Sequence, residues 1–216
     1  MTPREAARQI AACCRALAHG GLIAGVDGNL SVRLGPGRVL VTPTGVRKAD
    51  LAPGDMVQVD AAGRRRAGRR KPTSELALHL RLLAERPDVG AVVHAHPPAA
   101  TGFAVAGEGL DTLVLPELIV LCGPVPLVPY GTPGTPELGE RAAPFARTHD
   151  VLLLANHGAV ALGTTLEQAW VRMETLEHAA RILLAARLLG RVTPLDPAAV
   201  AGLLARRGPT RERDGV

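Results

Sequence analysis

Ala91-Val92-Val93-His94-Ala95-His96-Pro97 is the stretch from which we infer the fold of this chain. Small and β-branched apolar residues lead into two histidines, and two prolines end the segment, which predicts a buried β-strand. Because side chains alternate between the two faces of a strand, His94 and His96 point to the same side. Two imidazoles on one face supply half of a Zn²⁺ site, which needs three or four N, O or S ligands. Taken alone, the pair is also compatible with ordinary polar residues at the end of a strand.

The composition is that of a globular protein with one substantial core: 216 residues, of which 47% are hydrophobic and 21% charged. Only 2% are aromatic, so base-stacking platforms for single-stranded nucleic acid are scarce. The excess positive charge, +5 in total, gathers at residues 64–66 and 69–71 without a nucleic-acid-binding motif. A solvated turn, or a basic rim around an anionic substrate, is therefore favoured over a nucleic-acid partner.

The cellular compartment is inferred from the cysteines and the absence of targeting signals. Cys13, Cys14 and Cys122 form no disulfide framework, which is typical of a reduced intracellular protein. No run of apolar residues is long enough to span a membrane, and the N-terminus lacks a signal-peptide pattern. We therefore expect a cytoplasmic protein without a membrane partner.

Three long helices are predicted from capping signals and apolar spacing. The first follows a capping box of Thr2 and Glu5 and ends at Gly20-Gly21. The second opens at residues 72–75, and the third runs from Thr165 to Gly190. The expected apolar faces are Leu76, Leu80 and Leu83 in the second helix, and Trp170, Met173, Leu176, Ala180 and Leu184 in the third. Glu174, Glu177 and His178 are expected on a solvated face or in intersubunit salt bridges rather than in catalysis.

The strands and the domain organisation follow from the turns. Short apolar runs alternate with Gly/Pro turns between residues 29 and 60, which favours an antiparallel meander. Residues 151–155 form a further buried strand that ends in Asn156-His157-Gly158. Because no repeat or low-complexity linker interrupts the chain, we expect a single domain over residues 1–216, with a core at about 5–190 and a tail at 191–216.

Several turns carry groups that could bind an anion or a metal. Exposed backbone N–H groups and the Asn29 amide in the segment Gly25–Val32 could hold a phosphate oxygen, although alone this pattern favours a plain turn. Pro43-Thr44-Gly45 is a second turn rich in N–H and hydroxyl donors, and the helix start at Pro72–Glu75 could face a phosphate. For Glu75 the simpler alternative is helix capping. His157 stands at a strand end beside a glycine, where it could be a third metal ligand or an ordinary turn residue.

In this order, the segments resemble the class II aldolase/adducin family from about residue 5 to residue 190. The resemblance rests on six short matches at comparable spacing, since any one of them is weak alone. These are Asp27-Gly28-Asn29-Leu30-Ser31, Thr42-Pro43-Thr44-Gly45, Pro72-Thr73-Ser74-Glu75, Val93-His94-Ala95-His96-Pro97, Gly131-Thr132-Pro133-Gly134-Thr135 and Asn156-His157-Gly158. Before the Gly-Asn pair the family usually has a serine or a small residue, whereas this chain has Asp27.

The resemblance implies a three-layer α/β/α fold with a central, mainly antiparallel sheet. It also implies a homotetramer with active sites at subunit interfaces. In the aldolases of the family three histidines and a glutamate hold Zn²⁺, and these fall on His94, His96, His157 and Glu75. Another divalent ion, such as Co²⁺, Mn²⁺ or Fe²⁺, suits the same ligands.

The resemblance further implies a lyase of the L-fuculose-1-phosphate aldolase type, which cleaves a small phosphorylated ketose through a metal-stabilised enediolate. Glu75 would move the proton at the reacting carbon. The phosphate would lie among the donor-rich turns. The residues that match there are Gly28, Asn29, Thr44, Gly45, Thr73 and Ser74. A sugar-phosphate 4-epimerase of this fold typically has aspartate at the position of Glu75, which favours the aldolase branch.

One departure concerns the acid that protonates the aldehyde oxygen. The family's sugar-phosphate aldolases use a tyrosine from a neighbouring subunit, in the region that matches residues 110–118. This chain has no tyrosine there and only Tyr130 elsewhere, so Glu117 becomes the ionisable candidate for the acid/base role. Decarboxylation of a phosphorylated 3-oxo sugar acid, or dehydration of a ketose phosphate, is an alternative on the same site. A non-catalytic adducin-like oligomeric scaffold is the alternative from another class.

Overall fold

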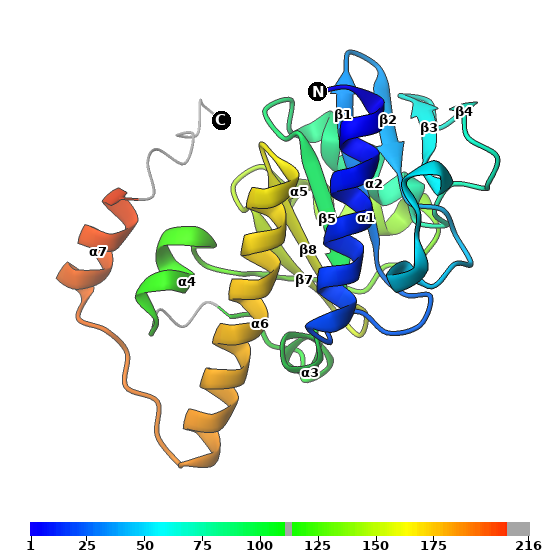
Figure 1. Cartoon of the computed structure of the whole chain (residues 1–216). Helices are drawn as coiled ribbons and strands as arrows, with labels where there is room; N and C mark the ends of the chain where they lie inside the picture. The colour runs from blue at the N-terminus through cyan, green and yellow to red at the C-terminus, as the bar shows by residue number, and fades with distance from the viewer. Residues whose placement is uncertain (111–113, 207–216) are drawn as a thin grey trace.

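The computed structural model describes residues 1–110 and 114–206, which form one eight-stranded sheet with helices around it (Figure 1). The helices are α1 (Pro3–His19), α2 (Leu76–Glu85), α3 (Pro98–Val105), α4 (Pro116–Leu121), α5 (Pro136–Ala146), α6 (Leu166–Leu188) and α7 (Pro197–Arg206), with short 3₁₀ turns at Lys48–Asp50 and Pro53–Asp55. The strands are β1 (Asn29–Gly35), β2 (Arg38–Val41), β3 (Val57–Asp60), β4 (Arg65–Ala67), β5 (Ala91–Ala95), β6 (Leu127–Val128), β7 (Val151–Leu154) and β8 (Gly158–Gly163).

The sheet is mixed but mostly antiparallel, in the order β4-β3-β2-β1-β5-β8-β7-β6. The first three strands form the antiparallel meander that the turn spacing predicts, and β4 extends it by one more antiparallel strand. The strand β5, which carries the two histidines, lies in the middle between β1 and β8, and is antiparallel to both. Of the described ladders, the pairing of β6 with β7 is the parallel one. The site strand is therefore held by backbone hydrogen bonds on both edges.

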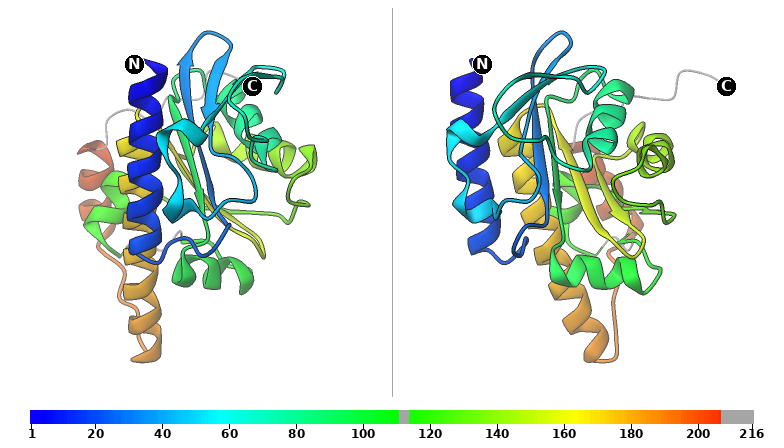
Figure 2. Two further views of the ribbon diagram at one scale, coloured as in Figure 1. Left: turned by 45° about the vertical axis from the view of Figure 1, so that its right-hand side comes forward. Right: turned by 90° about the vertical axis from the view of Figure 1, so that its right-hand side faces the viewer.

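Apolar residues bury both faces of this sheet because side chains alternate along its strands. Val93 contributes to a cluster with residues of α1, α3 and α6, whereas Val92 contributes to a second cluster with residues of α2 and α5. The right-hand view of Figure 2 shows α1 and α6 on one side of the sheet and α2 and α5 on the other. Because both faces of β5 are buried, its sequence begins with a continuous apolar run and does not alternate between apolar and polar residues.

The helix predictions are confirmed in their positions and corrected in some of their faces. Thr2 and Glu5 form the expected capping box of α1. In α2 the buried positions are Leu78, His79, Leu82 and Leu83, while Leu76 and Leu80 are partly buried. In α6, Leu184 was assigned to the apolar stripe but is 45% exposed. Glu177 was expected on a solvated face, yet it is 3% exposed, because α3 packs over it.

The arginine-rich segment is partly strand rather than only a turn, since β4 covers Arg65–Ala67. Three of its six basic side chains form ion pairs with aspartates that precede the segment. Arg64 and Arg66 both contact the Asp60 carboxylate, at 2.9 and 2.7 Å, and Arg70 contacts Asp55 at 2.6 Å. These ion pairs support the interpretation of a solvated turn.

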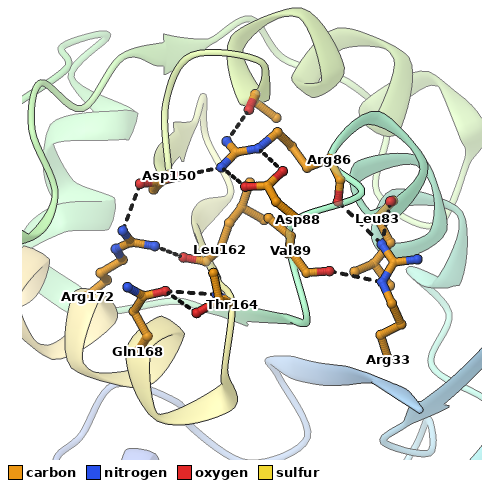
Figure 3. A network of polar contacts seen from close by, with 11 residues as sticks. Arg33, Leu83, Arg86, Asp88, Val89, Asp150, Leu162, Thr164, Gln168 and Arg172 are labelled. Carbon is orange, nitrogen blue, oxygen red and sulfur yellow. Dashed lines mark hydrogen bonds and ion pairs between the residues drawn. The ribbon is translucent and has the colours of Figure 1, made fainter. Parts of the chain in front are cut away.

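A network of arginines and aspartates connects helices to strand ends at the edge of the sheet away from the histidines (Figure 3). Arg86, directly after α2, binds Asp88 at 2.8 Å and Asp150 at 3.0 Å. Arg172 of α6 reaches the same Asp150 at 2.8 Å, and its guanidinium also donates to the Leu162 carbonyl of β8. The network therefore joins elements from both faces of the sheet through side chains that are mostly buried.

Among the described helices none is long and apolar enough to cross a membrane.

Candidate metal centre

Two strand ends bring the three predicted histidines together. His94 and His96 lie at the end of β5, and His157 lies in the tight turn between β7 and β8. One nitrogen from each ring falls in a group whose members all lie within 4.8 Å of one another. The ring centroids are 4.8–5.0 Å apart and the rings meet edge to face. Such convergence of imidazole nitrogens is the arrangement of a divalent-metal site.

Glu75 completes the group from the opposite side. It occupies the position before the first residue of α2, where its side chain makes no capping hydrogen bond. Instead Oε2 lies 3.1 Å from Nε2 of His94, and Oε1 lies 3.4 Å from Nε2 of His157. The capping alternative for Glu75 is therefore wrong, since its carboxylate faces the histidines.

Contacts outside the cluster orient the rings. His94 donates from Nδ1 to the carbonyl of Ala159 at 2.9 Å, which directs Nε2 to the centre of the site. Nε2 of His96 lies 3.1 Å from Nε2 of His94. On its other side, Nδ1 of His96 lies 3.5 Å from Oδ2 of Asp27. Carbonyl and carboxylate partners of this kind fix the tautomer and the ring orientation of metal-binding histidines.

The electrostatics of the metal-free cluster favour a proton on His94 over one on His96 or His157. Burial opposes a charge on His94, but the Glu75 carboxylate raises its pKa. Burial and the positive charge of His94 lower the pKa of both His96 and His157 to about 4. Burial would raise the pKa of Glu75, yet the charge of His94 and hydrogen bonds from His94 and Asn29 lower it below its usual range. The group therefore offers a carboxylate and two free imidazole lone pairs at neutral pH.

The donor set fits a divalent cation. Three imidazole nitrogens and one carboxylate are the ligands of the typical His₃-carboxylate site. Within the described residues, the buried Oε1 of Glu75 accepts no hydrogen bond. A buried carboxylate oxygen without a donor is rare in proteins unless an ion or water binds it. The residues present thus fit a divalent metal.

The glycine before Asn29 is required by close packing. Gly28 has a φ of +67°, and a Cβ there would lie 2.6 Å from Cγ2 of Ile23 and 3.1 Å from the carbonyl oxygen of His94. Neither the conformation nor the space suits another residue. The turn before β1 therefore runs against the backbone of the histidine strand.

The other predicted anion-binding turns lie side by side near this point. An isolated bridge joins Pro43 to Pro72, and the N–H of Thr73 donates to the carbonyl of Thr42 at 3.0 Å. Thr44, Gly45 and Ser74 are exposed, whereas Thr73 is buried and its Oγ1 accepts from the N–H of Glu75. Segments that are distant in sequence therefore present hydroxyls and N–H groups at one edge of the candidate centre.

Asn29 differs from the expectation of a free substrate-binding amide. It pairs with His94 in the β1–β5 ladder. Its Nδ2 donates to Oε2 of Glu75 at 2.7 Å, and its Oδ1 lies 2.5 Å from Nε2 of His79. Both ends of the amide are therefore engaged within the protein.

Sequence reasoning missed two residues beside the centre, Asp27 and His79. A signal existed for each, because Asp27 directly precedes Gly28 and His79 lies four positions after Glu75, on the same side of a helix. Neither signal is specific without the fold.

Glu117 lies outside this group. Its side chain is exposed in the first turn of α4, which packs mainly against α6 and α7. A role in the site of the same chain has no support from the described contacts, so its acid/base role stays a prediction.

Comparisons with known proteins agree with this geometry. Residues 8–184 match the family model described as the Class II Aldolase and Adducin N-terminal domain. The chain is 42% identical over 165 residues to a 5-methylthioribulose-1-phosphate/5-deoxyribulose-1-phosphate aldolase of Rhodospirillum rubrum, which covers 76% of this chain and 71% of that protein. It is 38% identical over 168 residues to a 3-oxo-tetronate 4-phosphate decarboxylase of Escherichia coli O6:H1, with 76% and 78% covered. Among solved structures, an L-fuculose 1-phosphate aldolase superposes with a TM-score of 0.87 at 29% identity, over 94% of this chain and 95% of that one.

Proposed function

Since the chain belongs to the class II aldolase and adducin family, we propose that it is a divalent-metal-dependent carbon–carbon lyase that acts on a small phosphorylated ketose. The observation that carries this proposal is the convergence of His94, His96, His157 and Glu75. An adducin-like scaffold has no use for buried imidazoles around a carboxylate, because burying polar groups is costly unless they serve a function. Zn²⁺ is the metal we favour, with Co²⁺ or Mn²⁺ as substitutes on the same ligands.

The four side chains would hold the metal, and a bound divalent cation supplies Lewis-acid polarisation of the substrate's carbonyl and hydroxyl oxygens. Glu75 is the residue that we assign to move the proton at the reacting carbon. Its low pKa keeps it ionised at neutral pH, so it can accept a proton. Asn29 holds Oε2, while Oε1 is left without a hydrogen-bond donor from the described residues. Oε1 is thus the atom available to the substrate.

The phosphate of the substrate would bind at the edge where the three turns meet. Exposed Thr44 and Ser74 offer hydroxyls, and Gly45, at a φ of +70°, offers backbone close to the site without a side chain. Gly28, Asn29 and Thr73 are buried, so we assign them to shaping these turns and holding Glu75 as much as to direct contact.

Decarboxylation of a phosphorylated 3-oxo sugar acid is the second candidate. It is favoured by the absence of tyrosine from residues 110–118, because loss of carbon dioxide leaves no aldehyde oxygen to protonate. The 38% identity to a protein named as such a decarboxylase supports it. If aldol cleavage is the reaction, Glu117 is our candidate for the acid, supplied by a neighbouring subunit.

The assembly that this implies is a homotetramer of single-domain subunits with sites at their interfaces. The apolar end of α6 supports an interface, since Leu188 and Leu189 are 81% and 88% exposed. Each subunit would have the three-layer arrangement of the family, in which α1 and α6 cover one face of the sheet and α2 and α5 the other. We expect the protein in the cytoplasm, where phosphorylated sugars are metabolised.

The proposal is tested by metal content and then by turnover. Purified without chelators, the native protein should contain about one divalent metal per subunit, while His94→Ala and His96→Ala should contain almost none. His178→Ala, which changes an exposed histidine of α6, serves as the control. The metal-loaded protein is then assayed with ketose 1-phosphates for aldehyde release and with 3-oxo acid phosphates for carbon dioxide release. A well-folded native protein that binds no divalent metal would instead support the scaffold.

A further inference from the structure

A line of buried polar side chains leads away from the candidate centre behind Glu75. Its first step is the 2.7 Å hydrogen bond from Nδ2 of Asn29 to Oε2 of Glu75. The second joins Oδ1 of Asn29 to Nε2 of His79 at 2.5 Å, and the third joins Nδ1 of His79 to Oγ of Ser31 at 2.7 Å. His79 and Ser31 have no exposed surface, and Asn29 has 5%. Bulk water therefore does not reach the His79 and Ser31 side chains.

With a neutral His79 ring, only one assignment of hydrogens satisfies every member. The Glu75 carboxylate is an acceptor, so Asn29 must present its NH₂ to Glu75 and its carbonyl oxygen to His79. That oxygen needs a donor, so His79 must carry its proton on Nε2. Nδ1 of His79 is then an acceptor, and the hydroxyl of Ser31 donates to it. The direction of each bond follows from the charge on Glu75.

The regular spacing of residues in β1 and α2 brings these four side chains together. Asn29 and Ser31 are two residues apart in β1, so they lie on the same face of the sheet. His79 is four residues after Glu75 along α2, so it lies one turn beyond it on the same side of the helix. One strand and one helix thus hold all four side chains against each other.

We propose that His79 is a positioning residue that fixes the Asn29 amide in the orientation that binds and holds Glu75. The expected effect on catalysis rests on the proposed function, whereas the expected tautomer of His79 does not. A side chain at position 79 that cannot donate leaves the Asn29 oxygen without a partner. The amide is then free to turn its oxygen toward the Glu75 carboxylate, where two acceptors repel each other. Glu75 loses the bond to Oε2 and with it the orientation of Oε1.

The tautomer of His79 tests the line independently of any activity. The metal-free protein is labelled with ¹⁵N in its histidines, and the imidazole ¹⁵N shifts and couplings of His79 are assigned by comparison with a His79→Gln spectrum. We expect a neutral ring protonated on Nε2 across the neutral pH range. A ring protonated on Nδ1, or one that exchanges between tautomers, would overturn the proposal even if the protein is an active lyase.

Paired variants then test the consequence for Glu75. His79→Leu removes the donor, whereas His79→Gln keeps an N–H near the position of Nε2. We expect His79→Leu to lower kcat by about 10- to 100-fold with little change in KM, and His79→Gln to restore most of the loss. Leu82→Ala is the matched control, because Leu82 is buried one turn further along α2 in the apolar cluster. It should lower stability without changing kcat.

Metal affinity gives a second readout that does not need a substrate. Competition with a chelator should show a weaker affinity for Zn²⁺ in His79→Leu than in His79→Gln, since only the latter keeps Glu75 in place. If the native protein turns over no substrate but the tautomer and the affinities are as expected, the proposed function fails and the positioning role stands. Equal Zn²⁺ affinity in the two His79 variants, or equal kcat where the native protein is active, would overturn the positioning role. If His79→Leu does not fold, Ser31→Ala replaces it. The Asn29 oxygen still needs a donor in that variant, so His79 should stay protonated on Nε2, and a shift of the proton to Nδ1 would likewise overturn the proposal.

Discussion

A Cβ on Gly158 would lie 2.6 Å from Cδ2 of His96 and 2.6 Å from the carbonyl oxygen of Ala95. The β7–β8 turn therefore runs against the ring of a candidate ligand, and the glycine that follows His157 leaves the space for that ring. The contact between Gly158 and the His96 ring thus links His96 to the turn that carries His157, although the two histidines are 61 positions apart in the sequence.

Gly158→Ala should accordingly disrupt the metal centre rather than the fold as a whole. The added methyl group must displace the His96 ring or the β8 backbone by several tenths of an ångström. We expect the affinity for Zn²⁺ to fall by at least about 10-fold, measured by chelator competition. Gly102→Ala is the control, because a Cβ at Gly102 meets nothing within 4 Å. Unchanged metal affinity in Gly158→Ala would show that the position of the His96 ring does not depend on this glycine.

Asp27→Asn should weaken metal binding through His96. Oδ2 of Asp27 lies 3.5 Å from Nδ1 of His96, and its Oδ1 accepts from the N–H of Ala24 at 2.6 Å. Asparagine keeps an acceptor for Ala24 but removes the charge that makes His96 a stronger ligand. Loss of such a partner typically lowers metal affinity by about 10- to 100-fold. Isothermal titration with Zn²⁺ measures the change.

The matched control for Asp27→Asn is Asp50→Asn, which removes an exposed carboxylate from a nearby turn. It should bind Zn²⁺ as the native protein does. If Asp27→Asn also binds Zn²⁺ with native affinity, Asp27 serves only to hold the turn before Gly28.

The strand that carries His94 and His96, and the face to which they point, could be predicted because one short stretch of sequence specifies both. A run of apolar residues with two histidines at i and i+2 specifies both the strand and the face. The antiparallel meander of β1–β3 followed from its turns in the same way. The spacing of α6 predicted the helix but not its exact buried face, since Leu184 is exposed.

The direction of Glu75 could not be predicted locally, because a glutamate before a helix is compatible with capping. Only the packing of α2 beside β1 and β5 turns its carboxylate toward His94. The same holds for His79, which looks like one more residue on a helix until β1 places Asn29 and Ser31 beside it. Glu177 was misassigned for a related reason, since nothing in α6 reveals that α3 covers it.

The stability of the metal-free protein should fall as the pH is lowered from about 6.5 toward 4. In the folded state the pKa values are about 3 for His79 and about 4 for His96 and His157, because burial and the charge of His94 oppose protonation. The unfolded chain has histidines with a pKa near 6.5 and binds more protons in this window, so unfolding is favoured by acid. Each such histidine contributes up to about 1.4 kcal/mol per pH unit. The raised pKa of His94 acts in the opposite sense and reduces the total slope.

Urea unfolding of the metal-free protein at several pH values measures this slope. His79→Gln removes one histidine that resists protonation, so its slope should be smaller by about 1.4 kcal/mol per pH unit below pH 6. Leu82→Ala, which removes no titratable group, should lower the stability at every pH and leave the slope unchanged. Equal slopes for the native protein and His79→Gln would show that His79 is protonated in the folded state.

Glu177→Ala should destabilise the protein through the start of α3, the helix that follows the histidine strand. The Glu177 carboxylate is 3% exposed and accepts from the N–H groups of Ala99 and Ala100, each at 3.0 Å, and from Arg181 at 2.7 Å. Alanine leaves two buried N–H groups unpaired and removes a negative charge from a helix N-terminus, which costs about 2–3 kcal/mol of unfolding free energy. Glu177→Gln keeps one acceptor oxygen and should lose less. Glu174→Ala, which changes an exposed glutamate one turn earlier in α6, should have no measurable effect in the same urea titration. Equal midpoints for Glu177→Ala and Glu174→Ala would show that α3 does not depend on this carboxylate.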